Sequence, residues 1–277
     1  MGAVFALASA VSFGISDVSG AVAARRLSSV NVALGMQLAG LLALLPALWL
    51  LPGAPSWRAI AIGAAAGLIG NLGLILYLRC MALGPIGVIS PIAALIGAAV
   101  PVAWGVLIAG DDLGWAQRVG VAVGLIAVVA SAYRPGSSIR AGGSRGPLVA
   151  LVAGAAFGLF FVILDATPPD SGLWPLLGAR FGGLASILVM ALAVRRSPIP
   201  RTALGLVAFS GVTDVLANAL FLLATRTGLL SLVSLLASLY PVVAVLVARL
   251  VLAERLSRLQ GGGVVLAMVA LALLVGG

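Results

Sequence analysis

The sequence predicts an all-α polytopic membrane protein with ten transmembrane helices, arranged as two inverted five-helix repeats. Three observations predict this class. Of the 277 residues, 62% are hydrophobic and 8% are charged, whereas a soluble domain is roughly 45–50% apolar and about 25% charged. The apolar residues form ten runs of bilayer-spanning length, and the second half of the chain aligns with the first at one constant offset. A water-soluble fold is excluded because the chain has too few polar residues to cover its surface.

Each apolar run between charged or Pro- and Gly-rich breaks is expected to form one helix, because a hydrocarbon core of about 30 Å requires ~20 helical residues. The first run exceeds the ~7–15 residues of a signal-peptide core and has no basic segment before it, so we interpret it as a retained helix. The breaks before the fourth and ninth runs, ALGPIG and RTGLLS, are the least distinct. In chain order, the expected helices cover residues 2–24, 30–51, 59–80, 85–108, 116–133, 147–165, 173–194, 202–225, 229–251 and 259–276.

The chain divides into two expected repeats, residues 1–140 and 141–277, joined by the Gly-, Ser- and Arg-rich linker RPGSSIRAGGSRG. Five helices cross a membrane an odd number of times, so equivalent helices are expected to run in opposite directions, a recurring plan of secondary transporters. Each match between the halves is weak alone, but their common offset of 144 residues indicates a repeat. The shift places Phe13-Gly14 on Phe157-Gly158, Gly67 on Gly211, Tyr77 on Phe221, Gly84 on Gly228 and Ser90 on Ser234.

The charges and the reactive residues exclude several classes of protein. All sixteen basic residues are arginines between apolar runs, a pattern of membrane topology and not of a nucleic-acid-binding face. Twelve of the arginines lie in or beside the odd-numbered loops, and three lie in or beside the even-numbered loops. Because cytoplasmic loops carry the excess of basic residues, this count places the odd-numbered loops inside and both termini outside. One cysteine and no histidine exclude an internal disulfide and argue against a metal site. GGSRG and QGGGVV lack the GK[ST] element of a phosphate loop, so we expect neither an enzyme nor a cofactor.

Three ionisable residues lie inside expected helices and away from their ends, where a charge costs at least ~2.5 kcal/mol on insertion scales and therefore faces an interior or a cavity. Asp17 is expected either to receive the ammonium group of a substrate or to carry a proton; the alternative is an ion pair or hydrogen bond to a neighbouring helix. Asp214, with Asn218 one turn later, belongs to a binding site or to a structural polar network. Arg180 binds a substrate carboxylate or phosphate through its planar fork, or reaches the membrane interface.

Further side chains are expected to line a midplane cavity where the repeats meet, the place where inverted-repeat carriers bind substrate. Core packing is the alternative for each aromatic residue. Proline removes a helical hydrogen bond, so Pro91, Pro101 and Pro241 are expected to be hinges. The remaining expected cavity residues are Phe13, Gln37, Asn71, Tyr77, Phe157, Phe161, Phe221 and Tyr240.

A carboxy-terminal stretch, SLYPVVAVLVARLVLAERLSRLQGGGVVLAMVALAL, contains a Pro in the penultimate helix, a Glu in a short ER turn and a Gly-rich final helix. ARF at 179–181 contains an Arg-Phe pair in the second helix of the second half, and Gln37 occupies the position of this Arg in the first half. In the first half, Asp111 also replaces the Glu of the ER turn. In these features the whole chain resembles the EamA-type proteins of the drug/metabolite transporter superfamily, and it is similar to bacterial exporters of amino acids, including aromatic ones.

The resemblance implies a multi-pass protein of the cell (inner) membrane with both termini in the cytoplasm, opposite to the arginine count. It implies a secondary transporter that exports small metabolites by alternating access, and amino acids, including aromatic ones, are the expected substrates. One alternative is proton-coupled export of cationic drugs through Asp17. Another is a non-transporting membrane scaffold or lipid-handling protein, which a packed interior without a cavity would favour. The expected partners are a small-molecule substrate and the lipid bilayer, with protons in the drug alternative, and a monomer is sufficient because it contains both halves.

Overall fold

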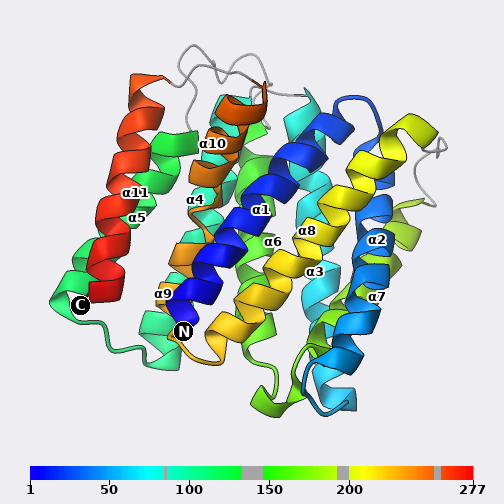
Figure 1. Cartoon of the computed structure of the whole chain (residues 1–277), viewed down its shortest axis with the longest axis horizontal. Coiled ribbons are helices and arrows are strands. Elements are labelled where there is room, and N and C mark those ends of the chain that lie inside the picture. Colours follow the sequence, from blue (N-terminus) through cyan, green and yellow to red (C-terminus); the bar gives the residue numbers. More distant parts are fainter. Residues whose placement is uncertain (84–85, 133–145, 192–199, 253–256, 277) are drawn as a thin grey trace.

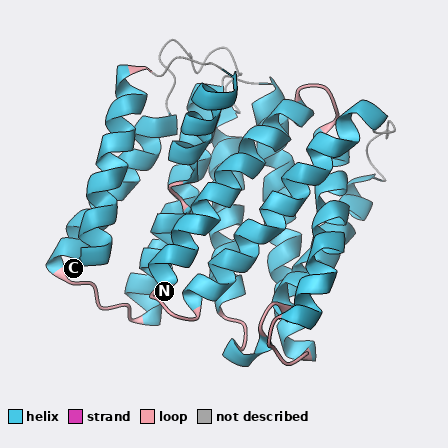
Figure 2. Cartoon of the chain, viewed as in Figure 1, coloured by secondary structure: helices cyan, strands magenta, loops and turns pink. Residues whose placement is uncertain are grey.

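The computed structural model describes residues 1–83, 86–132, 146–191, 200–252 and 257–276, and all regular structure in them is helical (Figure 2). The expected boundary between residues 140 and 141 lies outside these residues. The helices are α1 (Gly2–Ala24), α2 (Ser29–Leu50), α3 (Trp57–Leu83), α4 (Ile86–Trp104), the π-helical turn η1 (Gly105–Ala109), α5 (Trp115–Ala132), α6 (Gly146–Asp165), the short 3-10 turn η3 (Pro169–Ser171), α7 (Trp174–Ala191), α8 (Arg201–Thr225), α9 (Leu230–Ala237), α10 (Tyr240–Leu252) and α11 (Arg258–Gly276).

Two expected helices differ from the structure. The run 229–251 was expected to be continuous, but α9 ends at Ala237 and α10 begins at Tyr240. The cause is Pro241, which has no N–H to continue the helical ladder. The run 85–108 was also expected to be one α-helix, but it changes to the wider turn η1 after Trp104. The other described helices begin and end within a few residues of the expected runs.

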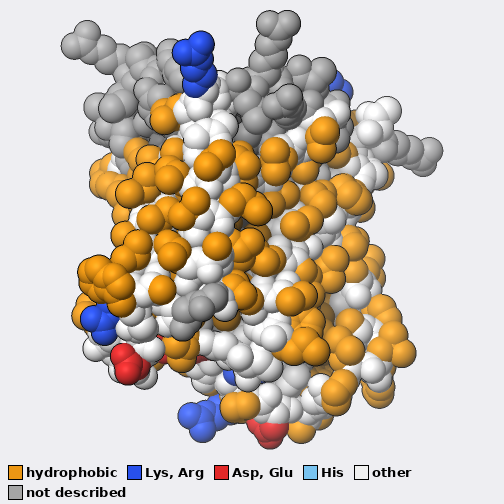
Figure 3. All heavy atoms as spheres, turned by 60° about the vertical axis from the view of Figure 1, so that its left-hand side comes forward, with side chains coloured by type: hydrophobic (Ala, Val, Ile, Leu, Met, Phe, Trp, Pro, Cys, Tyr) orange, Lys and Arg blue, Asp and Glu red, His pale blue; other side chains and the backbone are white. Residues whose placement is uncertain are grey.

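The helices have the length and composition of membrane spans. Seven described helical stretches are long and apolar enough to cross a bilayer, within α1, α2, α3, α4 with η1, α6, α8 and α11, and shorter apolar stretches lie in α5, α7 and α9 with α10. On the face shown in Figure 3, hydrophobic side chains cover the middle, whereas the described charged side chains lie toward the two ends. Exposed Trp49, Trp57 and Trp115 lie at helix ends, where a membrane interface favours this residue. The chain is therefore a multi-pass membrane protein.

The bundle consists of two layers of helices (Figure 1). In one layer α10, α1, α8 and α2 are successive neighbours, and in the other α4, α6, α3 and α7 are. Helices α5 and α11 pack against each other at one side of the bundle. Because α1 contacts α8 and α10 whereas α6 contacts α3 and α4, the first helix of each half packs mainly against helices of the other half.

Glycines allow the closest approaches between the halves. A Cβ atom on Gly67 of α3 would overlap the carbonyl group of Ala179 of α7, and one on Gly211 of α8 would overlap that of Met36 of α2. Gly67 and Gly211 are the pair that the sequence offset aligns. Small residues let helix backbones approach closely in a membrane, so these contacts explain why glycine occurs at both positions.

The aligned Phe-Gly pairs have matching contacts as well. A Cβ atom on Gly14 of α1 would lie 2.7 Å from Cβ of Val243 in α10, and one on Gly158 of α6 would lie 2.5 Å from Cβ of Val100 in α4. Each glycine therefore brings the first helix of one half against the fourth segment of the other half.

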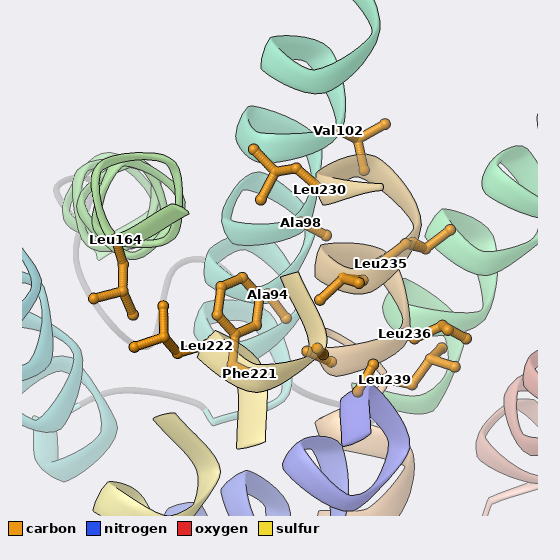
Figure 4. Packing of buried hydrophobic residues seen from close by; sticks show 14 of the residues in the cluster. Ala94, Ala98, Val102, Leu164, Phe221, Leu222, Leu230, Leu235, Leu236 and Leu239 are labelled. Carbon is orange, nitrogen blue, oxygen red and sulfur yellow. The ribbon is translucent and has the colours of Figure 1, made fainter. Parts of the chain in front are cut away.

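The largest group of buried apolar side chains surrounds α9. Phe221 of α8 packs there with Leu235, Leu236 and Leu239 around the end of α9, as Figure 4 shows. Nearly every side chain of α9 is buried. This segment is thus held inside the bundle, away from lipid.

Candidate functional site

A cavity of about 130 Å³ lies inside the bundle, larger than the ~10–15 Å³ that one water molecule requires. Every described α-helix except α5 and α11 contributes to its lining. A packed interior, which would have favoured a scaffold, is therefore not what the structure shows. Of the twelve expected cavity residues, eleven line it: Phe13, Asp17, Gln37, Asn71, Tyr77, Phe157, Phe161, Arg180, Asp214, Asn218 and Tyr240.

Arg180 forms a buried ion pair with Asp214. Its Nη2 atom lies 2.8 Å from Oδ2 of Asp214, and the two side chains are 6% and 19% exposed. Nη1 of Arg180 donates a hydrogen bond of 2.8 Å to Oε1 of Gln37. The interpretation that Arg180 reaches the membrane interface is therefore wrong, because its charge is neutralised inside the bundle.

The ion pair belongs to a larger polar network. Gln37 donates through Nε2 to Oδ1 of Asn71 at 2.9 Å, and Asn71 donates to the Ser186 hydroxyl at 2.6 Å. On the other side, Asn218 donates to the backbone oxygen of Asp214 at 2.8 Å. Gln37 and Asn71 thus orient one side of the guanidinium. The Nε atom of Arg180 is buried and has no hydrogen-bond partner among the described residues.

Asp17 is the other acid of the cavity. Its side chain is half-buried in α1, and the Tyr77 hydroxyl donates a hydrogen bond of 3.2 Å to Oδ2. No ion pair joins Asp17 to an arginine within the described part of the chain. The expected alternative of an ion pair with an intramembrane arginine is therefore not found there, whereas the other expected alternative, a hydrogen bond to a neighbouring helix, is present as the bond from Tyr77 of α3. The carboxylate also lines the cavity.

Aromatic rings form two groups on the cavity wall. The Phe13 ring lies 5.9 Å from that of Phe161 and 6.3 Å from that of Tyr240, whereas Tyr77 packs at 5.7 Å against Phe157. Phe221 was expected in the cavity but does not line it: this ring is 0% exposed and lies 4.3 Å behind Phe161. Its position in the core confirms the packing alternative for this one residue.

The helix break places backbone polar groups at the cavity. Because Pro241 has no N–H, the carbonyl of Ala237 lacks its usual donor four residues later, and both Ala237 and Ser238 line the cavity. Pro101 lies inside α4 without interrupting it, four residues before η1. Pro91 also lies in α4, but its side chain is outside the described set. Of the three expected hinges, only Pro241 thus coincides with a break.

Sequence reasoning missed several lining residues, including Ser16, Met36, Phe160 and Ser238. Ser16 and Ser210 exchange hydrogen bonds of 2.9 Å between each hydroxyl and the other backbone carbonyl, which joins α1 to α8 next to Asp17. The available signal was local: Ser16 precedes Asp17, and Ser238 lies three residues before Pro241. No group of three or more Cys, His, Asp or Glu side chains suited to a metal ion occurs in the described ranges.

Comparisons with known proteins add a family and a fold. Residues 1–133 and 144–276 each match the EamA-like transporter family. A solved structure titled "Crystal structure of protein" is similar in fold, with a TM-score of 0.72, 16% sequence identity, and coverage of 96% of this chain and 95% of that one. At this identity the similarity shows the fold alone. Among curated proteins, no match was found.

Proposed function

Since the chain belongs to the EamA-like transporter family, whose members are generally transporters and not enzymes, we propose that it is a secondary transporter of small organic molecules that carry a protonated amine. The observation that carries this proposal is the charge balance of the cavity. Asp214 neutralises Arg180, so Asp17 is the cavity charge without a counter-ion among the described residues. An ammonium group would supply that counter-ion.

The surroundings of Asp17 support an amine with an apolar body. Phe13 and Tyr240 lie on one part of the wall and Tyr77 with Phe157 on another. Aromatic faces attract cations, and the attraction grows when the site excludes water. A charge in a membrane interior also requires a partner. The acid therefore binds the amine while the rings contact the remainder of the molecule.

Amino acids, including aromatic ones, are a second candidate within this class. The observation that favours them is that Arg180 lines the cavity and that its buried Nε–H has no hydrogen-bond partner among the described residues. A substrate carboxylate would accept this hydrogen bond, while the ammonium group of the same molecule binds Asp17. Cationic drugs need no such acceptor, so the two kinds of substrate differ in their need for a carboxylate.

Transport requires two access states, and we attribute them to two inverted five-helix repeats, residues 1–140 and 141–277, in a cell (inner) membrane. The start of α1 lies beside the end of α8. Arg226, at this end of α8, donates a hydrogen bond of 2.8 Å to the carbonyl of Thr167, just after α6. Helix α1 thus begins where α6 ends. Antiparallel equivalent helices and the matched glycine contacts support the inverted layout. The break before Pro241 supports a hinge for alternating access.

Counterflow into proteoliposomes tests the function. The liposomes are preloaded with an unlabelled solute, and the labelled panel pairs aromatic, aliphatic and hydroxy amino acids with their decarboxylated amines. Amines that exchange without a carboxylate support the proposal, whereas exchange of amino acids alone supports the second candidate. Asp17→Asn is expected to abolish either exchange. Asp112→Asn, in a loop where the side chain is 98% exposed, is the matched control and should exchange normally. Exchange that survives Asp17→Asn would contradict the role of this acid.

A further inference from the structure

Helix α9 contains two buried hydroxyl groups, those of Ser231 and Ser234. Ser231 and Ser234 lie three residues apart on one face of the helix and are both 0% exposed. Neither hydroxyl has a hydrogen-bond partner among the described residues. Other buried helical serines of the described residues have acceptors, either in the preceding turn, as Ser12 has in the Ala8 carbonyl at 3.0 Å, or in another helix, as Ser9 has in the Ala217 carbonyl at 2.8 Å. Most buried hydroxyls in native proteins are paired with protein or with ordered water, and a water molecule would satisfy each of these two.

One end of this serine face lies at the surface where α9 begins. The backbone N–H of Ser231 donates a hydrogen bond of 2.9 Å to Oδ2 of Asp111, a half-buried acid in the loop after η1. Gly105 in the π-helical turn makes room for this contact, because a Cβ atom there would lie 2.5 Å from Oδ2 of Asp111 and 3.1 Å from Cβ of Ser231. The acid therefore lies directly at the first serine.

The other end of the face reaches the cavity. Ser238 follows Ser234 by one helical turn and lines the cavity, next to the Ala237 carbonyl that Pro241 leaves without its usual donor. From Ser231 to Ser238 the rise is about 10 Å at ~1.5 Å per residue. Water molecules need two to four polar partners each, and the two hydroxyls, the carboxylate and the freed carbonyl supply them along this distance.

We propose that Ser231 and Ser234 hold a file of water molecules that joins Asp111 at the protein surface to the cavity. The file lets water reach the cavity from the end of the bundle where α9 begins, without separation of the helices. It also carries protons, since each water accepts one proton and passes another to its neighbour. The existence of the file is independent of the proposed transport function, and only its use in coupling rests on that function.

Accessibility to Ag⁺, an ion close to water in size, tests the file. Ser231→Cys and Ser234→Cys are made separately after the native cysteine is replaced, Cys80→Ala. The control is Ser9→Cys. Ser9 is also 0% exposed, but its hydroxyl already donates a hydrogen bond of 2.8 Å to the Ala217 carbonyl and therefore needs no water molecule as a partner. Protein in lipid nanodiscs is exposed to Ag⁺ in chloride-free buffer, then unfolded, and the remaining thiol is measured with a fluorescent maleimide.

Both α9 cysteines are expected to react at least about tenfold faster than the control, which reacts only when the bundle opens locally. Reaction of both at the control rate would overturn the proposal, and so would reaction at Ser231→Cys alone, because the file would then stop before the cavity. If a variant does not fold, a structure of the unmodified protein that resolves water molecules decides the question: ordered water beside both hydroxyls supports the file, and dry packing there overturns it. None of these measurements depends on transport, so their failure is distinguishable from failure of the proposed function.

Discussion

Replacing the acid of the buried ion pair, Asp214→Asn, is expected to destabilise the protein strongly. The guanidinium of Arg180 is 6% exposed and would lose the only carboxylate within 4.0 Å among the described residues. Removing one partner of a buried pair typically costs about 3–5 kcal/mol because the other charge stays buried without compensation. We expect a loss near the lower limit, about 3 kcal/mol, since Asp214 is 19% exposed toward the cavity and the new amide retains one hydrogen-bond acceptor.

A double-mutant cycle measures the coupling. Thermal unfolding in detergent, followed by size-exclusion chromatography, is compared for Asp214→Asn, Arg180→Met and the double variant. Because the second substitution removes the unpaired charge, the double variant should lose clearly less stability than the two single variants together. The exposed pair Arg118–Asp112, at 3.9 Å, is the control and should show no measurable coupling. Additive losses at Arg180 and Asp214 would refute the reasoning, because they would mean that the two charges do not compensate each other.

Two further substitutions test the packing and the hinge. Gly67→Ala places a methyl group on the Ala179 carbonyl, so the α3–α7 contact must open and the unfolding free energy should fall by about 1–3 kcal/mol. The control is Gly205→Ala, where nothing lies within 4 Å, and it should leave the unfolding free energy unchanged or raise it. Equal effects of the two substitutions would contradict the close approach of α3 and α7. Pro241→Ala restores an N–H that can donate to the Ala237 carbonyl, so α9 and α10 should become more continuous. Counterflow should then slow while the substrate affinity stays unchanged. An unchanged rate of counterflow would show that the break is not a hinge.

Much of the fold was predictable because its cause is local. An apolar run long enough to span a bilayer must satisfy its backbone within one helix, and the expected run 2–24 indeed coincides with α1. The single helix expected at 229–251 was wrong for an equally local reason. Pro241 was recognised as a kink, but the position of the break at Ser238 and Leu239 depends on how the preceding turn closes with tighter hydrogen bonds.

The candidate site was predictable in composition but not in pairing. Asp17, Arg180 and Asp214 were identified because an ionisable side chain at membrane depth must face an interior, and all three line the cavity. Nothing in the sequence distinguished a substrate-binding arginine from one that reaches the interface. Phe221 shows the same limit, since its alignment with Tyr77 did not reveal that one ring faces the cavity and the other lies in the core.

The sequence by itself thus determined the medium, the helices and the side chains that must avoid lipid, because transfer into a membrane is a property of each segment alone. The tertiary structure decided which charges meet. Arg180 and Asp214 lie on different helices, and Gln37, which completes the pair, is 143 residues away from Arg180. Such contacts depend on the crossing of whole helices, so only the assembled bundle shows that Arg180 is neutralised and that Asp17 has no ion-pair partner among the described residues.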